Sequence, residues 1–582
     1  MKTACRATTL GALLVLLQAM GTALAQAPTP ADLVLQQGRI LRMASTGEDW
    51  ASAVAVRAGR IVAVGGPADV QPFIGPATRV VDLQGRMAMP GLIDAHAHPI
   101  DAAYERLYNC ALPPQGGLPE VLAAVKGCAA RAEPGEWIVG AAYSSAIAPA
   151  LEKRASLRLL DEASAGHPVL LRDDTFHNRW VNSEVLRRVG IRAGSVAPRG
   201  GHYVFDDGEP TGLLKEFPAF EPVQQLVPPR PVARLQQAAF SAAAELNAHG
   251  ITTVQDAWVN RTVLDAWHRA DRAPKRLPLR VVASLAGAKG VSSDEPGGLA
   301  LVEAGRPLQS DRLFPTFVKF FVDGVPMAHT AAMLAPYLPG HAHGHDFKGQ
   351  AHFTRDELVE QIAVLDRQGI PVKLHAVGDA AVRLSLDAIE VMRQRNGNSG
   401  PRHQVAHINW IAAADLPRFK ALNVTAENSP MVWVPTPVTP VIAQVLGQER
   451  AMHMNPMRSM LEQGAPLAVG SDWPAAQPTA DPWFGIEGLI TRRNPLGHFP
   501  GVMDESQTLT LRQALSAYTR DNAKALGLDG LVGSIEVGKR ADLIVLDQAL
   551  DRVPANRIHR TRVLSTYLDG ELVHEAPPAA VR

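Results

Sequence analysis

Three absences narrow what this chain can be. It has only 3 cysteines in 582 residues, so a metal site built from thiolates is not expected. Its 57 Lys and Arg residues balance 57 Asp and Glu residues, and this gives no electrostatic reason to bind nucleic acid or an anionic membrane. Internal repeats, low-complexity tracts and long charge runs are also missing, and 46% of the residues are hydrophobic, which excludes a disordered or fibrous chain. What is abundant is histidine, 19 in all, so any metal site would use imidazole and carboxylate groups.

The first 25 residues have the pattern of a signal peptide. Lys2 and Arg6 give a positive start, residues 10–17 are mostly apolar, and Ala-Leu-Ala at 23–25 is the small-x-small sequence that signal peptidase accepts. The apolar segment is much shorter than the roughly 20 residues that cross a bilayer, so we expect no membrane anchor. The sequence therefore predicts export, to the periplasm, with Cys5 removed along with the signal.

Cys110 and Cys128 remain in the mature chain. An even pair of cysteines in an oxidising compartment favours one disulfide that closes a short loop. Two buried free thiols are the alternative.

The order of patterns along the chain predicts a barrel beside a small sandwich. Both ends are rich in short alternating strands, whereas the middle alternates short apolar strands with helical stretches such as 358–369. We therefore expect an α/β fold: a (β/α)8 TIM-like barrel with an inserted subdomain, plus a small β-sandwich formed by both terminal segments. A Pro- and Gly-rich stretch at 194–212 is expected to be a loop. The expected domains are the signal peptide (1–25), the two parts of the sandwich (31–88 and 531–582) and the barrel (89–530), with its insertion at about 100–245.

Eight apolar segments in the middle region match the eight strands that such a barrel needs. Two further strand-like runs, WIVGAAY and HPVLLRDD, lie within the expected insertion and are not among the eight. The eight are MPGLIDAHAHP, GITTVQDA, LPLRVVAS, TFVKFFVDG, IPVKLHAVG, HQVAHIN, NVTAENS and PLAVGSD.

Five candidate metal ligands stand at the ends of these predicted strands. His96 and His98 occupy alternate positions, so both side chains project to one face. His375, His407 and Asp472 each close a later strand. Because residues at the carboxyl ends of barrel strands point into the active-site mouth, we expect these five groups to converge on a metal.

Lys319 lies among apolar neighbours within TFVKFFVDG, where an unpaired ammonium is costly. One interpretation pairs it with Asp323 or another carboxylate. The other makes it a lysine whose amine is carboxylated, so that the carbamate bridges two metals. Spacing alone leaves both open.

The motifs together resemble the amidohydrolase superfamily, specifically its YtcJ-like branch (amidohydrolase family 3). The resemblance runs in order through nearly the whole mature chain, and it implies the same barrel and sandwich. The matching segments are MPGLIDAHAHP, WVNSEVL, EPTGLLKE, GITTVQD, VKFFVDG, LHAVGDAAV, HINWI, VGSDWP and GSIEVGKRADLIVLD.

Roles for single residues follow from this resemblance. It implies that His96, His98 and Asp472 hold a more buried metal, and that His375 and His407 hold a more exposed one. Lys319 would be the carboxylated bridge. His177 matches a histidine of this branch that could hydrogen-bond substrate or stabilise an oxyanion; a surface loop histidine is the alternative.

Two positions depart from the pattern of the branch. His329 stands in DGVPMAHTA where an arginine is frequent, and Asn409 follows His407 where an acidic residue or Gln is common. Both changes concern substrate identity rather than metal binding.

The expected cofactor is a divalent metal, two Zn2+ bridged by carboxylated Lys319, and the expected activity is hydrolysis of a non-peptide C–N bond by a metal-bound hydroxide. Asp472 would act as general base and then general acid. The bond would belong to an amide, N-formyl group, carbamate or cyclic amide. Open alternatives are a mononuclear deaminase, a lactonase or phosphotriesterase on the same barrel, and a non-enzymatic solute-binding protein.

The expected partner is a small-molecule substrate, with no nucleic acid and no membrane anchor. A homodimer is expected only as the commonest assembly of soluble proteins.

Overall fold

The structure is a computed structural model that describes residues 28–44, 49–287, 297–339, 344–429, 431–477 and 479–577. The predicted signal peptide lies outside these residues. Among the helices that the structure describes, none combines the length and apolar character needed to cross a membrane.

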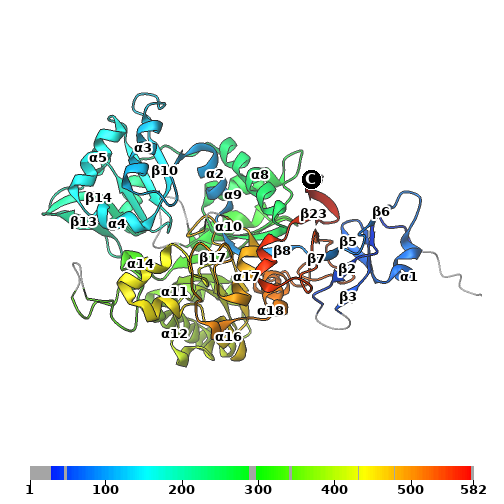
Figure 1. The fold of residues 1–582 in the computed structure, drawn as a ribbon. Helices are drawn as coiled ribbons and strands as arrows, with labels where there is room; N and C mark the ends of the chain where they lie inside the picture. Colours follow the sequence, from blue (N-terminus) through cyan, green and yellow to red (C-terminus); the bar gives the residue numbers. More distant parts are fainter. Residues whose placement is uncertain are drawn as a thin grey trace, which may run out of the picture.

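Eight parallel strands form the central barrel, as the sequence predicts (Figure 1). Each strand pairs with the next one along the chain. Past the strand ends, the N–H of Asp472 donates to the carbonyl of His96 (2.7 Å) and the N–H of His98 donates to the carbonyl of Trp473 (2.8 Å), which joins the last strand to the first. The strands are β8 (Leu92–Ala97), β15 (Ile251–Val259), β16 (Arg280–Ala286), β17 (Leu313–Phe321), β18 (Val372–Ala376), β19 (His403–His407), β20 (Val424–Asn428) and β21 (Leu467–Val469).

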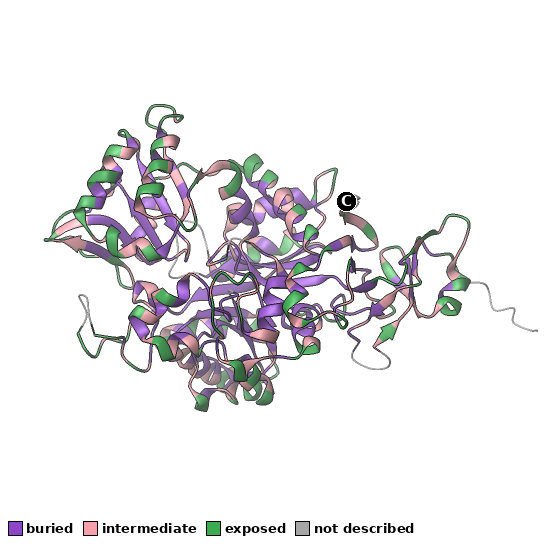
Figure 2. Cartoon of the chain, viewed as in Figure 1, coloured by how far each residue is buried: buried purple, intermediate pink, exposed green. Residues whose placement is uncertain are grey.

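Helices cover the outside of the barrel, and their outer faces are exposed while the strands are buried (Figure 2). The helix expected at 358–369 is α11 (Arg355–Arg367). Its capping box joins the side chain of Thr354 to the N–H of Glu357, and its buried Leu358, Ile362 and Leu365 follow helical spacing. The other barrel helices are α2 (Pro99–Tyr108), α8 (Val232–Ala248), α9 (Arg261–Asp271), α10 (Gly298–Gly305), α12 (Asp379–Asn396), α13 (Arg418–Ala421), α14 (Val438–Leu446), α15 (Gln448–Met452), α16 (Met457–Glu462), α17 (Pro482–Thr491), α18 (Leu511–Ser516) and α19 (Asn522–Ala525).

The segment MPGLIDAHAHP is two strands rather than one. β7 (Met87–Pro90) belongs to the terminal sandwich, and β8 starts after Gly91. The side chain of Thr252 lies 2.4 Å from the point where a Cβ on Gly91 would stand. The chain can therefore pass from sandwich to barrel only because this residue has no side chain.

Both terminal segments build the sandwich, at the end of the molecule opposite to the inserted unit (Figure 1). The carboxy-terminal strand β22 pairs antiparallel with the amino-terminal β7, which interleaves the two ends of the chain in one sheet. One sheet has the order β5-β4-β1-β6 and the other β24-β23-β22-β7-β2-β3. Their bounds are β1 (Leu33–Gln36), β2 (Arg39–Leu41), β3 (Trp50–Ala51), β4 (Ala53–Arg57), β5 (Arg60–Gly65), β6 (Arg79–Asp82), β22 (Leu543–Leu546), β23 (Val563–Leu568) and β24 (Glu571–Glu575).

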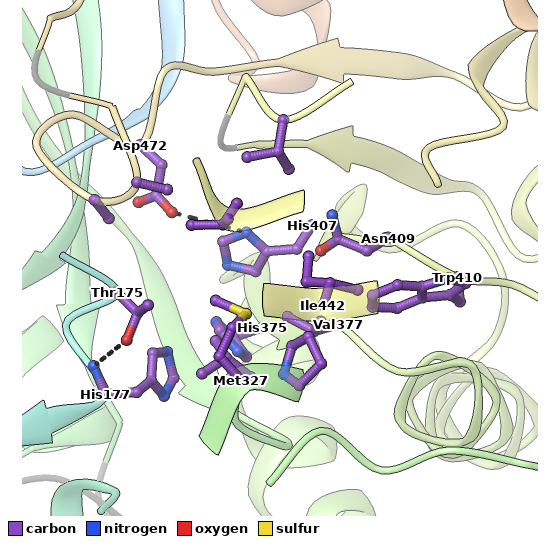
Figure 3. Close-up of a pocket in the computed structure, with 16 residues that line it drawn as sticks. Thr175, His177, Met327, His375, Val377, His407, Asn409, Trp410, Ile442 and Asp472 are labelled. Carbon is purple, nitrogen blue, oxygen red and sulfur yellow. Dashed lines mark hydrogen bonds and ion pairs between the residues drawn. The ribbon is translucent and has the colours of Figure 1, made fainter. Parts of the chain in front are cut away.

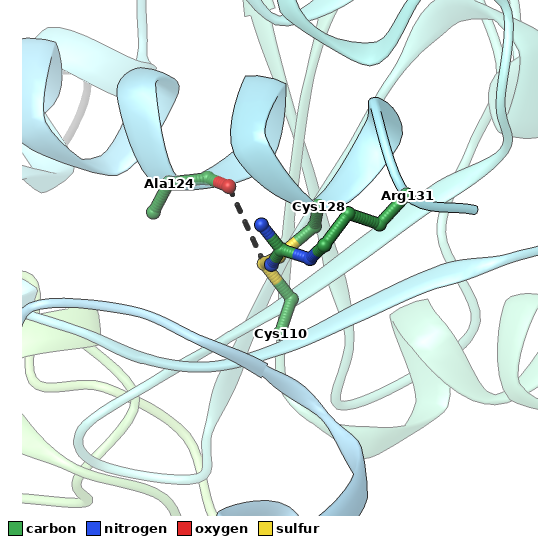
Figure 4. Close-up of a disulfide and its surroundings, with 4 residues drawn as sticks. All are labelled: Cys110, Ala124, Cys128 and Arg131. Atoms are coloured by element: carbon green, nitrogen blue, oxygen red, sulfur yellow. Dashed lines mark hydrogen bonds between the residues drawn. A yellow bond between two sulfur atoms is a disulfide. The ribbon is translucent and has the colours of Figure 1, made fainter.

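The inserted unit has its own sheet, ordered β13-β14-β12-β11-β10-β9. A disulfide between Cys110 and Cys128 ties its first strand to the end of α3 (Figure 4). The expectation of a loop at 194–212 is wrong in part, because β13 and β14 form a hairpin there. The strands are β9 (Cys110–Ala111), β10 (Ile138–Tyr143), β11 (Val169–Asp173), β12 (Asn178–Val181), β13 (His202–Asp206) and β14 (Glu209–Lys215), and the helices are α3 (Leu118–Ala129), α4 (Ala148–Leu151), α5 (Arg154–Ser164), α6 (Ser183–Val189) and α7 (Phe217–Gln224).

Candidate metal centre and active-site cleft

The predicted ligands meet at the carboxyl ends of the barrel strands. His96 lies in β8, His375 in β18 and His407 at the end of β19. Asp472 follows β21, and the two backbone hydrogen bonds that close the barrel hold it beside β8. One donor atom from each of His96, His98 and Asp472 lies within 4.8 Å of the other two.

Asp472 stands at the centre of this cluster. Its Oδ1 lies 3.2 Å from Nε2 of His98 and 3.4 Å from Nε2 of His96, while its Oδ2 lies 3.9 Å from Nδ1 of His407. Burial acts to raise the pKa of Asp472, but the hydrogen bond from His98 and the charges of its basic neighbours lower it overall. The side chain is therefore a carboxylate that can bind a cation.

Two histidines beside Asp472, His96 and His407, each have a second partner for Nδ1. Nδ1 of His96 is 2.7 Å from Oε2 of Glu427, on β20, and Nδ1 of His407 is 2.6 Å from the carbonyl of Ser429. Both contacts place the ring proton on Nδ1 and leave Nε2 as a lone-pair donor.

Nε2 of His407 is buried and has no hydrogen-bond partner in the described part of the chain. Such an orphaned nitrogen is costly unless something binds it. Burial lowers the pKa of His407 to about 3 and holds that of His96 well below its usual value, so both imidazoles are neutral. Neutral imidazoles beside a carboxylate fit a divalent metal.

Lys319 reaches the same cluster from β17. Its Nζ lies 3.3 Å from Nε2 of His96, and it makes no ion pair with a carboxylate among the described residues. The carboxylate of Asp323 instead accepts the backbone N–H groups of Ala332, Val377 and Gly378. Burial and the charge of Lys373 lower the pKa of Lys319 to about 7, which makes the uncharged amine accessible near neutral pH.

His177 enters from the inserted unit and faces His375, with 5.1 Å between the ring centroids. Its Nδ1 is 2.8 Å from Oε2 of Glu216, which is fully buried and also accepts from the hydroxyl of Thr330. Burial acts to lower the pKa of His177, but the Glu216 carboxylate raises it overall. His177 therefore lines the site, and the alternative of a surface loop histidine is wrong.

Two hollows meet at the metal centre. A recess of about 60 Å3 lies to one side, and Asn409 and Trp410 are among the residues that line it (Figure 3). A cleft of about 900 Å3 runs to the other side, past Trp258, between the barrel and the inserted unit. His329, the other departure from the branch pattern, is not among the residues that line either hollow.

Sequence reasoning missed the charged groups behind the ligands. Glu427 sits in the segment NVTAENS, which was identified only as a strand, and Glu216 sits in EPTGLLKE. For Glu427 the available signal was an acidic residue inside a predicted barrel strand, because a buried carboxylate needs a partner; Glu216 directly follows β14 and gave no such signal.

Comparison with known proteins identifies the family of this chain. A model described as "Amidohydrolase family" matches residues 79–574. N-substituted formamide deformylase of Arthrobacter pascens is 29% identical over 556 residues, which cover 94% of this chain and 98% of that protein. The putative amidohydrolase YtcJ of Bacillus subtilis (strain 168) is 26% identical over 553 residues, covering 92% of this chain and 98% of that protein.

The fold is shared with solved structures as well. An uncharacterized metal-dependent hydrolase from Pyrococcus horikoshii OT3 superposes with a TM-score of 0.69 at 22% identity, covering 90% of this chain and 99% of that one. The family match makes the chain a hydrolase that acts on carbon–nitrogen bonds, and its donor set fits a divalent metal. The chain belongs to the amidohydrolase family, in its YtcJ-like branch.

Proposed function

We propose that the protein hydrolyses a non-peptide C–N bond with two divalent metal ions, most simply Zn2+, held at the carboxyl ends of the barrel strands. The observation that carries this is the convergence of His96, His98 and Asp472 around one point, beside the orphaned Nε2 of His407. Such donors suit zinc, although imidazole and carboxylate also bind other divalent metals.

The donors divide into two sets. His96, His98 and Asp472 would hold the first metal, and His375 with His407 the second. Lys319 would bridge them as a carbamate, which forms only from an uncharged amine, and its lowered pKa supports this. When bound, the metals would supply an activated water and polarise the carbonyl oxygen of the substrate.

Asp472 would carry the proton between the two halves of the reaction. Its lowered pKa keeps it ionised, so it can accept a proton from the attacking water. It lines both hollows, so it can then deliver that proton to the departing nitrogen.

His177 would hold the carbonyl oxygen as negative charge develops on it. Glu216 accepts the proton of Nδ1 and raises the pKa of the ring, which favours the imidazolium form, in which Nε2 also carries a proton and is a hydrogen-bond donor. This arrangement supports a direct contact between His177 and substrate.

A mononuclear deaminase is the second candidate, and one observation favours it. The compact donor set contains three residues, while His375 Nε2 lies 3.4 Å from the carbonyl of Gly324. A single metal on the compact set would need no carbamate.

Metal content and substrate choice separate the two candidates. Elemental analysis of purified protein is expected to give about two metals per chain for the hydrolase and about one for the deaminase. N-formyl compounds should head a panel of amides, carbamates and cyclic amides, since the deformylase relative is named for N-substituted formamides. One metal per chain and ammonia release from an aminopurine would refute the hydrolase proposal.

We also propose export to the periplasm, based on the first 25 residues. Cell fractionation tests it, with a variant lacking those residues as the control. The disulfide between Cys110 and Cys128 supports an oxidising compartment.

A further inference from the structure

The recess and the cleft share their inner wall but differ in volume and in the residues of their other walls. Six residues line both of them, and these include the groups around the proposed metals. The shared residues are Thr175, His177, His375, His407, Asp472 and Ala475. A substrate whose scissile bond lies at this wall therefore extends one substituent into each hollow.

The recess is small and apolar. Behind His407, its wall is formed by side chains from the loop after β17, from Val377 and from α14; Figure 3 shows Ile442, Val377 and Met327 on the side away from Asp472. Apart from the wall shared with the cleft, Asn409 is its polar lining residue, and Ile442 is only 3% exposed. Its apolar lining residues include Val325, Met327, Val377, Val432, Val438 and Ile442.

Its size sets a limit. At about 60 Å3, the recess is less than half of the roughly 150 Å3 cavity that takes benzene. It can hold an alkyl group of up to about three carbons but no phenyl ring. The interior is packed, so a longer group needs side chains to move.

The cleft is large and mixed in character. It holds about 900 Å3, within the range of sites for drug-sized ligands. Near the proposed metal ligands its wall is aromatic, with Trp258 and Phe217 each packed against Phe321 at 5.1 and 4.8 Å between ring centroids. Farther out, Arg172 is paired with Glu105, and the wall continues to the disulfide.

We propose that the substrate has unequal arms: a short apolar acyl group of at most about three carbons in the recess, and a bulky amine substituent in the cleft. This rests on the proposed C–N hydrolysis. The orientation follows the sense of the deformylase relative, which is named for substrates with the smallest acyl group and a substituted nitrogen.

Two amide series test the proposal on the zinc-supplemented full chain. In the first, the amine is 4-nitroaniline and the acyl group grows from formyl through acetyl, propionyl and butyryl to hexanoyl and benzoyl. We expect kcat/KM to drop by about tenfold or more for each carbon beyond the limit. In the second, the acyl group is acetyl and the nitrogen substituent grows from methyl to naphthyl, with no such drop. A cut-off in the amine series, or in neither series, overturns the proposal.

Variants of Ile442 test whether the recess sets the limit on acyl-chain length. Ile442→Ala is expected to move the cut-off to longer acyl chains, and Ile442→Phe to restrict activity to formyl. Val445→Ala is the matched control, because Val445 lies on the same helix and in the same apolar cluster but does not line the recess. An unchanged acyl profile in both Ile442 variants refutes the assignment of the recess.

A binding experiment keeps this inference separate from the proposed function. If no amide is hydrolysed in either series, the C–N hydrolysis proposal fails. Calorimetry with acetohydroxamate and benzohydroxamate then measures the recess directly. We expect the acetyl compound to bind at least about tenfold more tightly, and Ile442→Ala to reduce that ratio. Equal affinities in the wild type overturn the recess proposal.

Discussion

Two buried charged residues next to His96, Glu427 and Lys373, allow a test of whether their pairing stabilises the protein and orients His96. Oε2 of Glu427 lies 2.7 Å from Nδ1 of His96 and 3.2 Å from Nζ of Lys373, whose Nζ also donates to the carbonyl of Ala95 at 2.8 Å. The side chains of Glu427 and Lys373 are completely inaccessible to solvent. Removing one of them leaves the other as a buried charge with an incomplete set of partners.

The magnitudes follow from that geometry. Glu427→Gln leaves the ammonium of Lys373 with a backbone carbonyl as its main acceptor and should destabilise the protein by roughly 3–5 kcal/mol. Lys373→Met leaves the carboxylate and should cost a similar amount. The double variant removes both charges together, so we expect it to lie within about 1 kcal/mol of the wild type.

The two single variants should lose similar stability but should differ in metal affinity. Glu427 orients His96 and holds its proton on Nδ1, so Glu427→Gln should weaken metal binding by about 10- to 100-fold. Lys373→Met keeps the contact between Glu427 and His96, so its affinity for the metal held by His96, His98 and Asp472 should fall much less.

Urea unfolding is measured on metal-free protein for the wild type, the two single variants and the double variant. The four free energies of unfolding give the coupling energy between Glu427 and Lys373. Competition with a chromophoric chelator gives the metal affinities. Additive losses of stability in the double variant would refute the pairing argument. Equal losses of affinity for the metal at His96 in the two single variants would refute the role of Glu427 in orienting His96.

Four further outcomes are expected. Asp472→Asn should lower kcat by about 100- to 10,000-fold while most of the metal stays bound, and retained turnover would exclude Asp472 as the proton carrier. Dialysis against a chelator should abolish hydrolysis and added Zn2+ should restore it; activity that survives metal removal, verified by elemental analysis, would contradict a metal-dependent reaction. The double variant Cys110→Ser and Cys128→Ser opens a loop of 18 residues and should cost about 3 kcal/mol in urea unfolding, with an unchanged midpoint as the contrary result. His177→Gln should lower kcat by about 100- to 1,000-fold with little change in metal content, whereas a change confined to KM would argue against contact with the developing charge.

Much of the fold follows from local pattern. The eight barrel strands are short apolar runs bounded by turns, and the carboxyl ends of parallel strands all lie at one end of a barrel. That is why the sequence alone predicts that His375 and His407, 32 positions apart, lie close together. The break at Gly91 could not be predicted, because it depends on the approach of Thr252 from a distant strand.

The expectation of a loop at 194–212 failed for a different reason. Asp207 and Gly208 connect β13 to β14, and both have positive φ, at 51° and 79°. Asp-Gly is the preferred pair for the tight turn between two antiparallel strands, so the signal was present within the Pro- and Gly-rich stretch. Composition suggested a loop, and the turn chemistry of this one pair outweighed it.

The two buried lysines show what only the structure could decide. Lys319 and Lys373 stand opposite each other on neighbouring strands, both within 3.4 Å of a nitrogen of His96. Lys373 donates to a carbonyl and to Glu427, so its ammonium is compensated where it lies. Lys319 has no carboxylate partner among the described residues, and the charge of Lys373 further lowers its pKa. Burial and the charge of Lys373 therefore make the uncharged form of Lys319 accessible near neutral pH, and carboxylation would require that form. Removing the charge in Lys373→Met should raise the pKa of Lys319 and reduce the fraction of the bridged, two-metal protein.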